Sequence, residues 1–300
     1  LVLGCKDRIE ISDERFNDIK NAINNIFEAL YIEEKLDFVI ENYFEFETTL
    51  LHSATRHMIF QNQDYDWYQE ERHLISRRMA NLLSSCRLYI DQTNHNISNI
   101  YGEGSDQLME IKQIKIAKYK SSFSYRLMEA LRNYVQHRGF PIHGVKFNSK
   151  RTNVDEIEES ELLFSITPYI KTKNLESDKK FNKSVAKELK NIGEIVDVKP
   201  LIRKFVGGIG HIHNQIRELI NDDVKKWEKV LIQSIQQFGS EFGDNIVGLS
   251  IAEINKEGLV RDSLSIFTEF NDRRKYLEKK NRLLDSISSR FVTGQIIPNS

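Results

Sequence analysis

Apolar residues recur at helical spacing over most of the first 140 residues. The first pattern starts after Ser12, a residue type that caps helix N-termini, and continues to Leu30. Three further patterns cover residues 33–60, 67–100 and 107–138. Apolar positions that return every three or four residues form one face of an α-helix. The sequence therefore predicts four helices in this part of the chain.

Polar and glycine-containing segments mark where these helices end. QNQDYD closes the second pattern and YGEGSD the third, and the last part of the third, DQTNHNISN, is polar enough to fray or turn. Gly139 and Pro141 stop the fourth. Helices joined by short connections pack antiparallel. We therefore expect residues 1–140 to form an antiparallel helical bundle.

Residues 141–300 have a different pattern of residue types, with strand-like as well as helical segments. VKFNSK and ELLFSITPYIKTK carry β-branched and aromatic residues with partial alternation, and NVDEIEES lies between them, which predicts a hairpin. A second strand pair, NIVGLSIAEI and LVRDSLSIF, flanks the turn NKEG. Helical patterns resume near Asn182, break at VDVKP, continue through Trp227 to Phe238, and return in FNDRRKYLEKKNRLLDSISSRF. The predicted fold class is mainly α with small antiparallel β additions, and residues 141–300 form a second region or part of the same domain.

Charge and cysteine content narrow the class of protein. The 43 basic and 44 acidic residues leave a net charge of -1 over 300 residues, so any nucleic-acid surface must come from local clustering of basic residues. Cys5 and Cys86 are too few for a disulfide framework, which favours a reducing, cytoplasmic location. No apolar run approaches the roughly 20 residues that span a bilayer, and no membrane partner is expected.

The segment EALRNYVQHRG, residues 129–139, places polar side chains together on the fourth predicted helix. At about 100° per residue, one arc of roughly 140° holds Glu129, Arg132, Asn133, Gln136 and His137. The opposite side would face the core with Leu127, Leu131, Tyr134 and Val135. A polar arc on a helix commonly faces solvent. This arc is also suited to catalysis or binding.

Basic residues precede this arc and make the helix locally positive within a neutral chain. They are Lys112, Lys115, Lys118, Lys120 and Arg126, with Glu110 and Glu129 as the nearby acids. A cluster of this kind either is simply solvated or faces phosphate groups. If it faces phosphate, these five residues are the expected RNA-binding residues.

The residues RNYVQH, from Arg132 to His137, resemble the signature of HEPN domains, the higher-eukaryote and prokaryote nucleotide-binding family. That signature is an Arg, four to six residues and a His, with a polar residue, commonly Asn, directly after the Arg. It sits near the end of a late helix in a bundle of four or five helices. The resemblance covers six residues for the motif and about the first 140 for the bundle.

Many HEPN proteins with this motif are metal-independent endoribonucleases, so the resemblance implies RNA cleavage without a metal or other cofactor. It makes Arg132 the phosphate clamp, because a guanidinium presents a fork of donors to phosphate oxygens. It makes His137 the acid or base that takes the proton from the RNA 2′-OH or protonates the leaving oxygen. Asn133 would position the phosphate or hold His137. From spacing alone, Glu129 would orient Arg132 or Asn133.

The same resemblance implies a homodimer in which both signature helices face one cleft. It also implies RNA as a partner, a role as a toxin or phage-defence effector, and an antitoxin or other defence-system subunit as a further partner. The alternative within the family is a non-catalytic module for dimerisation or for binding nucleotides or RNA. A third alternative is a helical scaffold that carries the motif by accident.

A second histidine group occurs in GHIHNQIRE, residues 210–218. His211 and His213 would share a face on a strand and could then bind a metal ion. GGIG precedes them, a helical pattern follows, and no third ligand is evident. We expect a helix start or a second RNA-contacting loop here, and no metal site.

Overall fold

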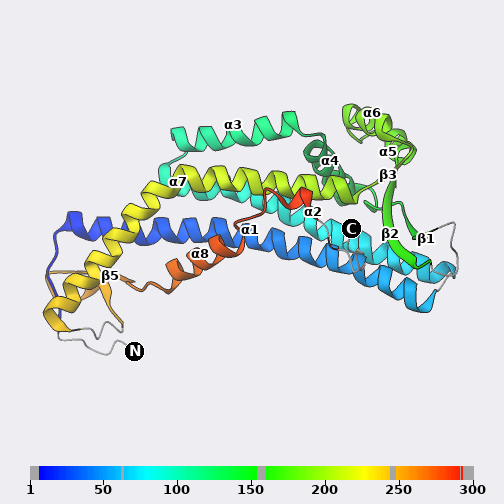
Figure 1. Cartoon of the computed structure of the whole chain (residues 1–300). Coiled ribbons are helices and arrows are strands. Elements are labelled where there is room, and N and C mark those ends of the chain that lie inside the picture. Colours follow the sequence, from blue (N-terminus) through cyan, green and yellow to red (C-terminus); the bar gives the residue numbers. More distant parts are fainter. Residues whose placement is uncertain (1–6, 62–63, 154–159, 244–247, 291, 293–300) are drawn as a thin grey trace. The chain divides into compact units, whose positions relative to one another are not determined.

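The computed structural model describes residues 7–61, 64–153, 160–243, 248–290 and 292. Over these residues the chain is mainly helical, and its strands form two small antiparallel sheets (Figure 1). The predicted fold class, mainly α with minor antiparallel β, is confirmed. Within the same residues, no helix combines the length and apolar character needed to cross a membrane.

The first helix, α1, runs without a break over Asp13–Phe60. It begins after Ser12, whose Oγ accepts a hydrogen bond from the Arg15 backbone N–H at 3.2 Å, as a cap does. The expected division into two helices is wrong. Glu33 interrupts the apolar pattern, but its buried carboxylate accepts hydrogen bonds from Arg217 at 2.7 and 2.6 Å. Because this polar group is satisfied inside the fold, the helix continues through it.

The second helix, α2, covers Tyr65–Tyr101, and the expected fraying of its last part is also wrong. The polar residues there are used inside the fold. The Asn96 amide donates to Glu28 at 2.5 Å, and its Oδ1 accepts from Lys35 at 2.5 Å. Thr93 is fully buried. Polar side chains that find partners in this way keep a helix regular where the sequence pattern alone indicates an end.

The fourth predicted helix is two helices, α3 (Asp106–Ser121) and α4 (Phe123–His137). Between them Ser122 has an extended backbone, with φ −117 and ψ 112, and its Oγ accepts from the Tyr125 N–H at 3.3 Å. Arg126 donates to two backbone carbonyls at the end of α3. The break therefore comes from a serine cap and a returning arginine, and not from glycine or proline.

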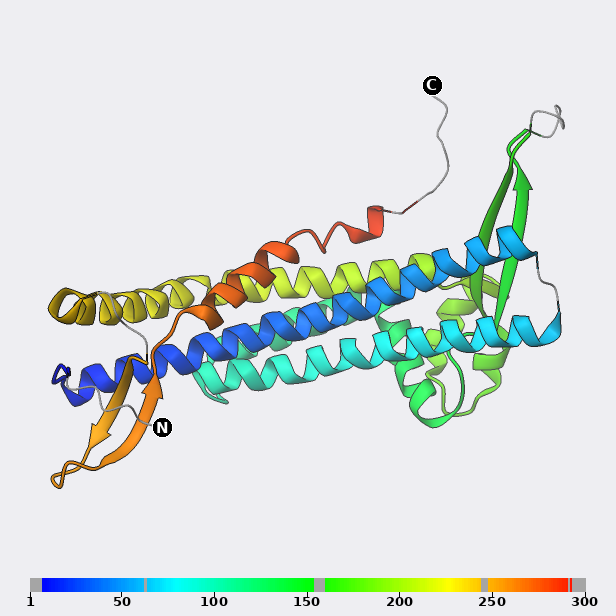
Figure 2. The ribbon, with the colours of Figure 1, turned by 90° about the horizontal axis from the view of Figure 1, so that it is seen from below.

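The first predicted hairpin is confirmed. Strands β1 (Gly144–Arg151) and β2 (Leu162–Lys171) pair antiparallel (Figure 2), and six residues of the acidic segment between them lie outside the described part of the chain. A short strand, β3 (Ile195–Asp197), extends the sheet in the order β1-β2-β3. Helices α5 (Thr172–Ser177) and α6 (Lys183–Ile192) lie between β2 and β3 in the chain.

The remaining elements include the longest helix of the second half, α7, which covers Lys199–Phe242. The GGIG segment lies inside α7, so the expected helix start or loop at that point is wrong. The second predicted strand pair is confirmed as β4 (Ser250–Ile254) and β5 (Val260–Ser265). The last helix, α8 (Glu269–Lys280), ends earlier than predicted and is followed by the 3-10 turn η2 (Ile287–Ser289).

The chain forms two compact units, each assembled from separate stretches of sequence. The first unit contains Leu1–Lys35, Gln92–Ile111 and Gln215–Arg282. The second unit contains Leu36–Asp91, Lys112–Asn214 and Leu283–Ser300. The two units interleave along the sequence, whereas the expected division near residue 140 is a single cut. That division stays a prediction.

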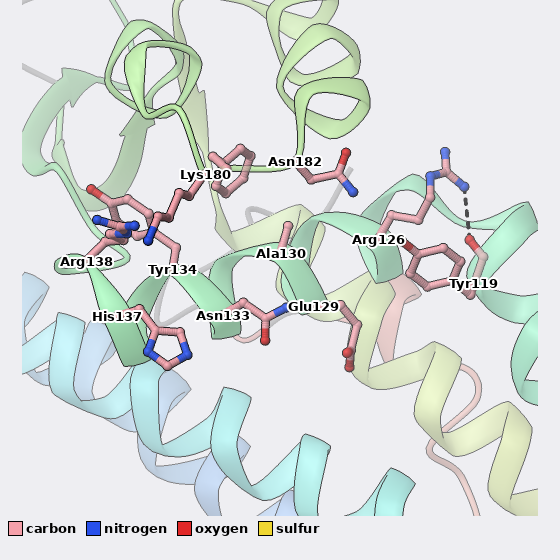
Figure 3. Close-up of a pocket in the computed structure, with 11 residues that line it drawn as sticks. Tyr119, Arg126, Glu129, Ala130, Asn133, Tyr134, His137, Arg138, Lys180 and Asn182 are labelled. Carbon is pink, nitrogen blue, oxygen red and sulfur yellow. Dashed lines mark hydrogen bonds between the residues drawn. The ribbon is translucent and has the colours of Figure 1, made fainter.

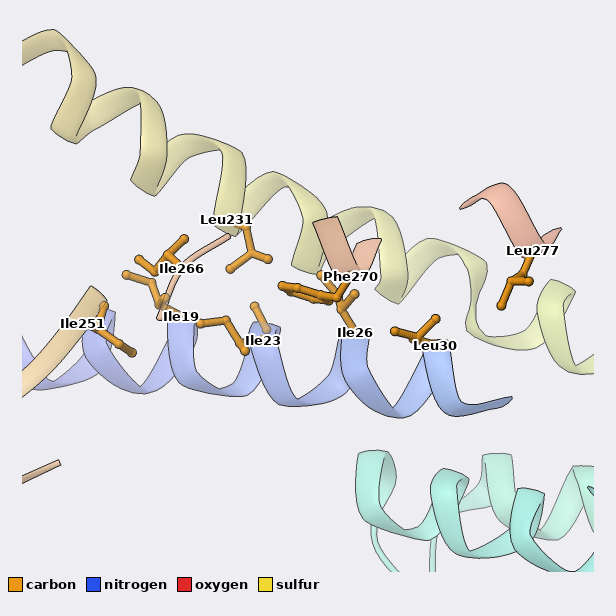
Figure 4. Packing of buried hydrophobic residues seen from close by; sticks show 10 residues of the cluster. Ile19, Ile23, Ile26, Leu30, Leu231, Ile251, Ile266, Phe270 and Leu277 are labelled. Atoms are coloured by element: carbon orange, nitrogen blue, oxygen red, sulfur yellow. The ribbon is translucent and has the colours of Figure 1, made fainter. Parts of the chain in front are cut away.

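Each unit has an apolar interior. In the first unit one face of α1 packs against α7, α8 and the β4–β5 hairpin (Figure 4). The rings of Phe27 and Phe270 stack there with their centroids 4.3 Å apart. In the second unit the α4 residues Leu127, Met128 and Leu131 are fully buried. Burying a side chain of this size contributes about 1.5–3 kcal/mol, so α4 is fixed through its apolar side.

Candidate functional site on helix α4

The polar side of α4 borders an open hollow in the second unit, with a volume of about 970 Å³ (Figure 3). The apolar side faces the core as predicted for Leu127 and Leu131, whereas Tyr134 and Val135 are only half-buried. The loop before α6 and the end of α3 supply the other walls. The lining residues are Tyr119, Arg126, Glu129, Ala130, Asn133, Tyr134, His137, Arg138, Lys180, Phe181 and Asn182.

Three of the four predicted catalytic residues, Glu129, Asn133 and His137, line this hollow. Asn133 and His137 are exposed. They lie four residues apart on α4, and Figure 3 shows both side chains on the same side of the helix. Arg132 is half-buried and is not part of the lining. Side chains five positions apart on a helix diverge by about 140°. Within one chain, the fold therefore does not bring Arg132 and His137 to the same wall.

Arg132 makes its contact with its neighbour instead. Its Nη1 donates a hydrogen bond to Asn133 Oδ1 at 3.2 Å. Its Nε is buried, and no described residue accepts from it. A buried donor without a partner raises the free energy of that arrangement. Arg132 thus has one N–H group unused within the described part of the chain.

Glu129 is more enclosed than its predicted role suggests. Its carboxylate accepts a hydrogen bond from Arg87 Nη1 on α2 at 3.1 Å, and its side chain is 16% exposed. Burial raises the pKa of Glu129, and the charges of Arg87 and Arg132 oppose that rise. The contact ties α4 to α2. The remaining residue of the polar arc, Gln136, is exposed and lies outside the lining.

The five predicted RNA-binding residues divide into three groups. Lys112 and Lys120 are exposed, and Lys118 is half-buried with its Cε close to Gly208 of α7. Lys115 is buried, and its Nζ donates to the Ile90 carbonyl at 2.7 Å. An ammonium group held in this way does not reach an RNA strand at the surface, so the prediction for Lys115 is wrong. It lies on the same helix side as Ile111, facing the interior.

Arg126 lines the hollow, but its guanidinium is already engaged. Nη1 donates to the Tyr119 carbonyl at 3.0 Å and to the Lys120 carbonyl at 2.6 Å, which closes the C-terminal end of α3. Nη2 donates to Glu188 of α6 at 2.6 Å. One side chain thus holds α3, α4 and α6 together at one edge of the hollow. The expected phosphate contact of Arg126 would compete with these bonds.

Two basic residues of the hollow were missed by the sequence reasoning. Arg138 directly follows the motif, and Lys180 comes from the loop between α5 and α6. Both side chains are exposed, and neither forms an ion pair with another described residue. Figure 3 shows them near each other and near Tyr134. The sequence could have indicated Arg138, because it directly follows His137. Nothing in the residues around Lys180 indicates that this side chain lies near α4.

The histidines of GHIHNQIRE have separate surroundings within α7. His213 is fully buried, and its Nδ1 shares a hydrogen bond with Tyr89 Oη at 3.0 Å. His211 is exposed. Residues two apart on a helix point in different directions, so the pair does not form a common binding face. Among the described residues, no group of three His, Cys, Asp or Glu side chains could hold a metal ion.

No family model, no curated protein and no solved structure matches this chain. The case for a function therefore rests on the residues of α4 and on the hollow beside it. Three features of that hollow matter chemically. They are an exposed imidazole, two exposed cations that are not used in ion pairs with the described residues, and a volume in the range of small-ligand sites.

Proposed function

We propose that this protein cleaves RNA at α4 by a metal-independent reaction in which His137 transfers the proton. The observation that carries the proposal is that the exposed imidazole of His137 lines the same hollow as Arg138 and Lys180. An imidazole gains and loses protons near neutral pH. Guanidinium and ammonium groups attract phosphate. Together they provide the two components that cleavage by the RNA 2′-OH requires.

The reaction needs no external nucleophile. The 2′-oxygen of one nucleotide attacks the adjacent phosphorus, and the bond from phosphorus to the 5′-oxygen of the next nucleotide breaks. His137 takes the proton from the 2′-OH or gives one to the departing 5′-oxygen. The cations stabilise the negative charge that builds up on the phosphate oxygens. The products are a 2′,3′-cyclic phosphate and a 5′-hydroxyl.

Arg132 enters the proposal through the resemblance of RNYVQH to the HEPN signature. Since Arg132 does not line the hollow of its own chain, we place its phosphate contact in a homodimer whose two α4 helices face one cleft. The resemblance also underlies the proposal of a cytoplasmic toxin or phage-defence effector, with an antitoxin or other defence-system subunit as a further partner.

The first test is RNA cleavage in the presence of EDTA. We expect the full chain to cut a 5′-labelled RNA and to leave 2′,3′-cyclic phosphate ends. His137→Ala should lower the rate by about 100-fold or more, because general acid–base catalysis contributes at least that much. Arg132→Ala should lower it by a similar factor. The cut positions and end groups are read by gel electrophoresis and mass spectrometry.

The matched control is His211→Ala, which removes an exposed helical histidine of the same compact unit. This variant should cleave as fast as the unmodified protein. Circular dichroism and a melting curve establish that each variant is folded. Undiminished cleavage by a folded His137→Ala protein would show that His137 does not carry the reaction.

A second candidate is RNA binding without cleavage. One observation favours it, namely that Arg132 and His137 do not share a wall of the hollow in one chain. A binding module would retain RNA through Arg138 and Lys180, and its RNA would remain intact after long incubation. Affinity measured alongside cleavage decides between the two functions.

A further inference from the structure

Aromatic rings line the hollow together with the cations. Tyr119, at the end of α3, lines it and is 39% exposed. Tyr134, which is half-buried, lines it near Arg138 and Lys180 (Figure 3). Basic groups that follow a phosphate backbone, combined with aromatic rings on which bases stack, are the recurring elements of sites for single-stranded nucleic acid.

The position of Tyr119 is fixed from two sides. Its backbone carbonyl accepts the hydrogen bond from Arg126, and its ring packs edge-on against the buried ring of Tyr125, with centroids 6.3 Å apart and an interplanar angle of 83°. Figure 3 shows the ring extending from α3 toward α4. A ring that is already held in place loses little conformational freedom when it binds a ligand.

We infer that the hollow takes an unpaired RNA strand, with one base stacked on Tyr119 and the phosphates near Arg138 and Lys180. RNA as the ligand rests on the proposed function. At about 1.5 Å per residue, α4 spans about 17 Å from Arg126 to His137, which is enough for a short run of nucleotides. A base inside a duplex is covered on both faces by its neighbours, so only an unpaired base can offer a face to Tyr119.

The test measures binding without cleavage. The probe is a fluorescein-labelled 2′-O-methyl RNA of mixed sequence, in which the 2′-oxygen cannot attack, and the readout is fluorescence anisotropy with the full chain. Tyr119→Ala should weaken binding of the single strand by about fivefold or more, since base–aromatic stacking has that magnitude. Tyr119→Phe and Tyr119→Trp keep a ring and should bind within about twofold of the unmodified protein.

Two controls separate stacking from other effects. Tyr65→Ala removes a more exposed tyrosine, 74% exposed, that lies in the same compact unit and outside the hollow, and it should leave binding unchanged. The same probe annealed to its complement should bind equally to the unmodified protein and to Tyr119→Ala. Unchanged single-strand binding by folded Tyr119→Ala, or an equal loss for the duplex, would overturn the inference.

A third arm uses a mononucleotide. Adenosine 3′-monophosphate should compete only at concentrations far above the affinity of the probe, because it reaches one cation cluster or Tyr119 but does not span both. Competition as strong as that of the unlabelled oligonucleotide would identify a nucleotide pocket and overturn the strand assignment.

The binding test and the cleavage test can fail independently of each other. Binding that depends on Tyr119, in a protein that never cleaves RNA, would retain the strand site and refute the proposed function. Cleavage that depends on His137, in a protein whose RNA binding is unchanged by Tyr119→Ala, would support the proposed function and refute the strand site.

Discussion

Lys115 is a charged side chain in the interior of the second unit. Its Nζ donates to the Ile90 carbonyl, and burial lowers its pKa to about 7. Asp91 opposes this shift and Arg87 adds to it. The sequence contained a signal for this burial, because Leu108, Ile111 and Lys115 share one helical face. The neighbouring lysines in the sequence instead indicate a basic surface.

This buried lysine predicts a pH dependence of stability. In the unfolded chain its pKa lies near the ordinary value of 10.5, above the value of about 7 in the folded chain. Between these values the unfolded state binds more protons, so the free energy of unfolding rises with pH from about 7 to about 10. Lys115→Met should flatten that rise and stabilise the protein at pH 7 by about 1–2 kcal/mol.

Urea unfolding at several pH values measures this effect. Lys112→Met is the matched control, since Lys112 is exposed on the same helix, and it should leave the pH dependence unchanged. A Lys115→Met protein with the same slope as the unmodified protein would contradict the assignment of the pH effect to Lys115.

At the level of elements, the sequence predicted those helices and hairpins that a local pattern of residues is sufficient to specify. The turn NKEG and the alternation around it are sufficient for β4 and β5. The sequence did not predict the features that depend on distant partners. The continuity of α1 requires Arg217 beside Glu33, and the corner at Ser122 is held by Arg126, which contacts Glu188 of α6. No local pattern contains these partners.

The glycines of α7 give a prediction at the same scale. A Cβ at Gly210 would lie 2.7 Å from Leu284 Cβ and 2.9 Å from the Leu284 backbone, so Gly210→Ala forces the segment after α8 to move. We expect a loss of about 1–3 kcal/mol, with faster hydrogen exchange at residues 283–289. Thermal melting and exchange mass spectrometry measure both effects.

Gly208→Ala serves as the control within the same helix. Its Cβ would lie 2.8 Å from Lys118 Cε, which is the far end of a flexible side chain, and 3.9 Å from Tyr125 Cδ2, which is an ordinary contact distance. Alanine favours a helix over glycine by up to about 1 kcal/mol, so this variant should be neutral or more stable. Equal destabilisation by both variants would show that close packing against Leu284 is not the cause.

For the whole molecule, the proposed homodimer decides how the candidate site is completed. The chain alone places His137, Asn133, Arg138 and Lys180 around the hollow, and it leaves Arg132 outside. The sequence motif identified His137 and Asn133 as residues of one surface. It did not show that His137 faces the hollow and Arg132 does not, because one wall of the hollow comes from the distant loop between α5 and α6.

A mixing experiment tests the dimer. Arg132→Ala and His137→Ala alone should each cleave at the strongly reduced rate expected above, and equal amounts incubated together should recover part of the cleavage rate. Random exchange of subunits places one copy of each variant in about half of the dimers. The recovery should grow with protein concentration. Light scattering that finds only monomers at high concentration, or a mixture without activity, would contradict a shared cleft.

The contacts of Arg126 have a consequence for protein engineering. Its planar fork reaches two carbonyls and a carboxylate at once, whereas a lysine would bring the same charge as a single ammonium point. Arg126→Lys therefore separates two properties that usually change together. It keeps the positive charge that attracts anions to this region, but it weakens the hydrogen bonds that hold the end of α3, and with it Tyr119, against α4 and α6. The strength of RNA attraction and the alignment of RNA in the hollow could then be adjusted independently.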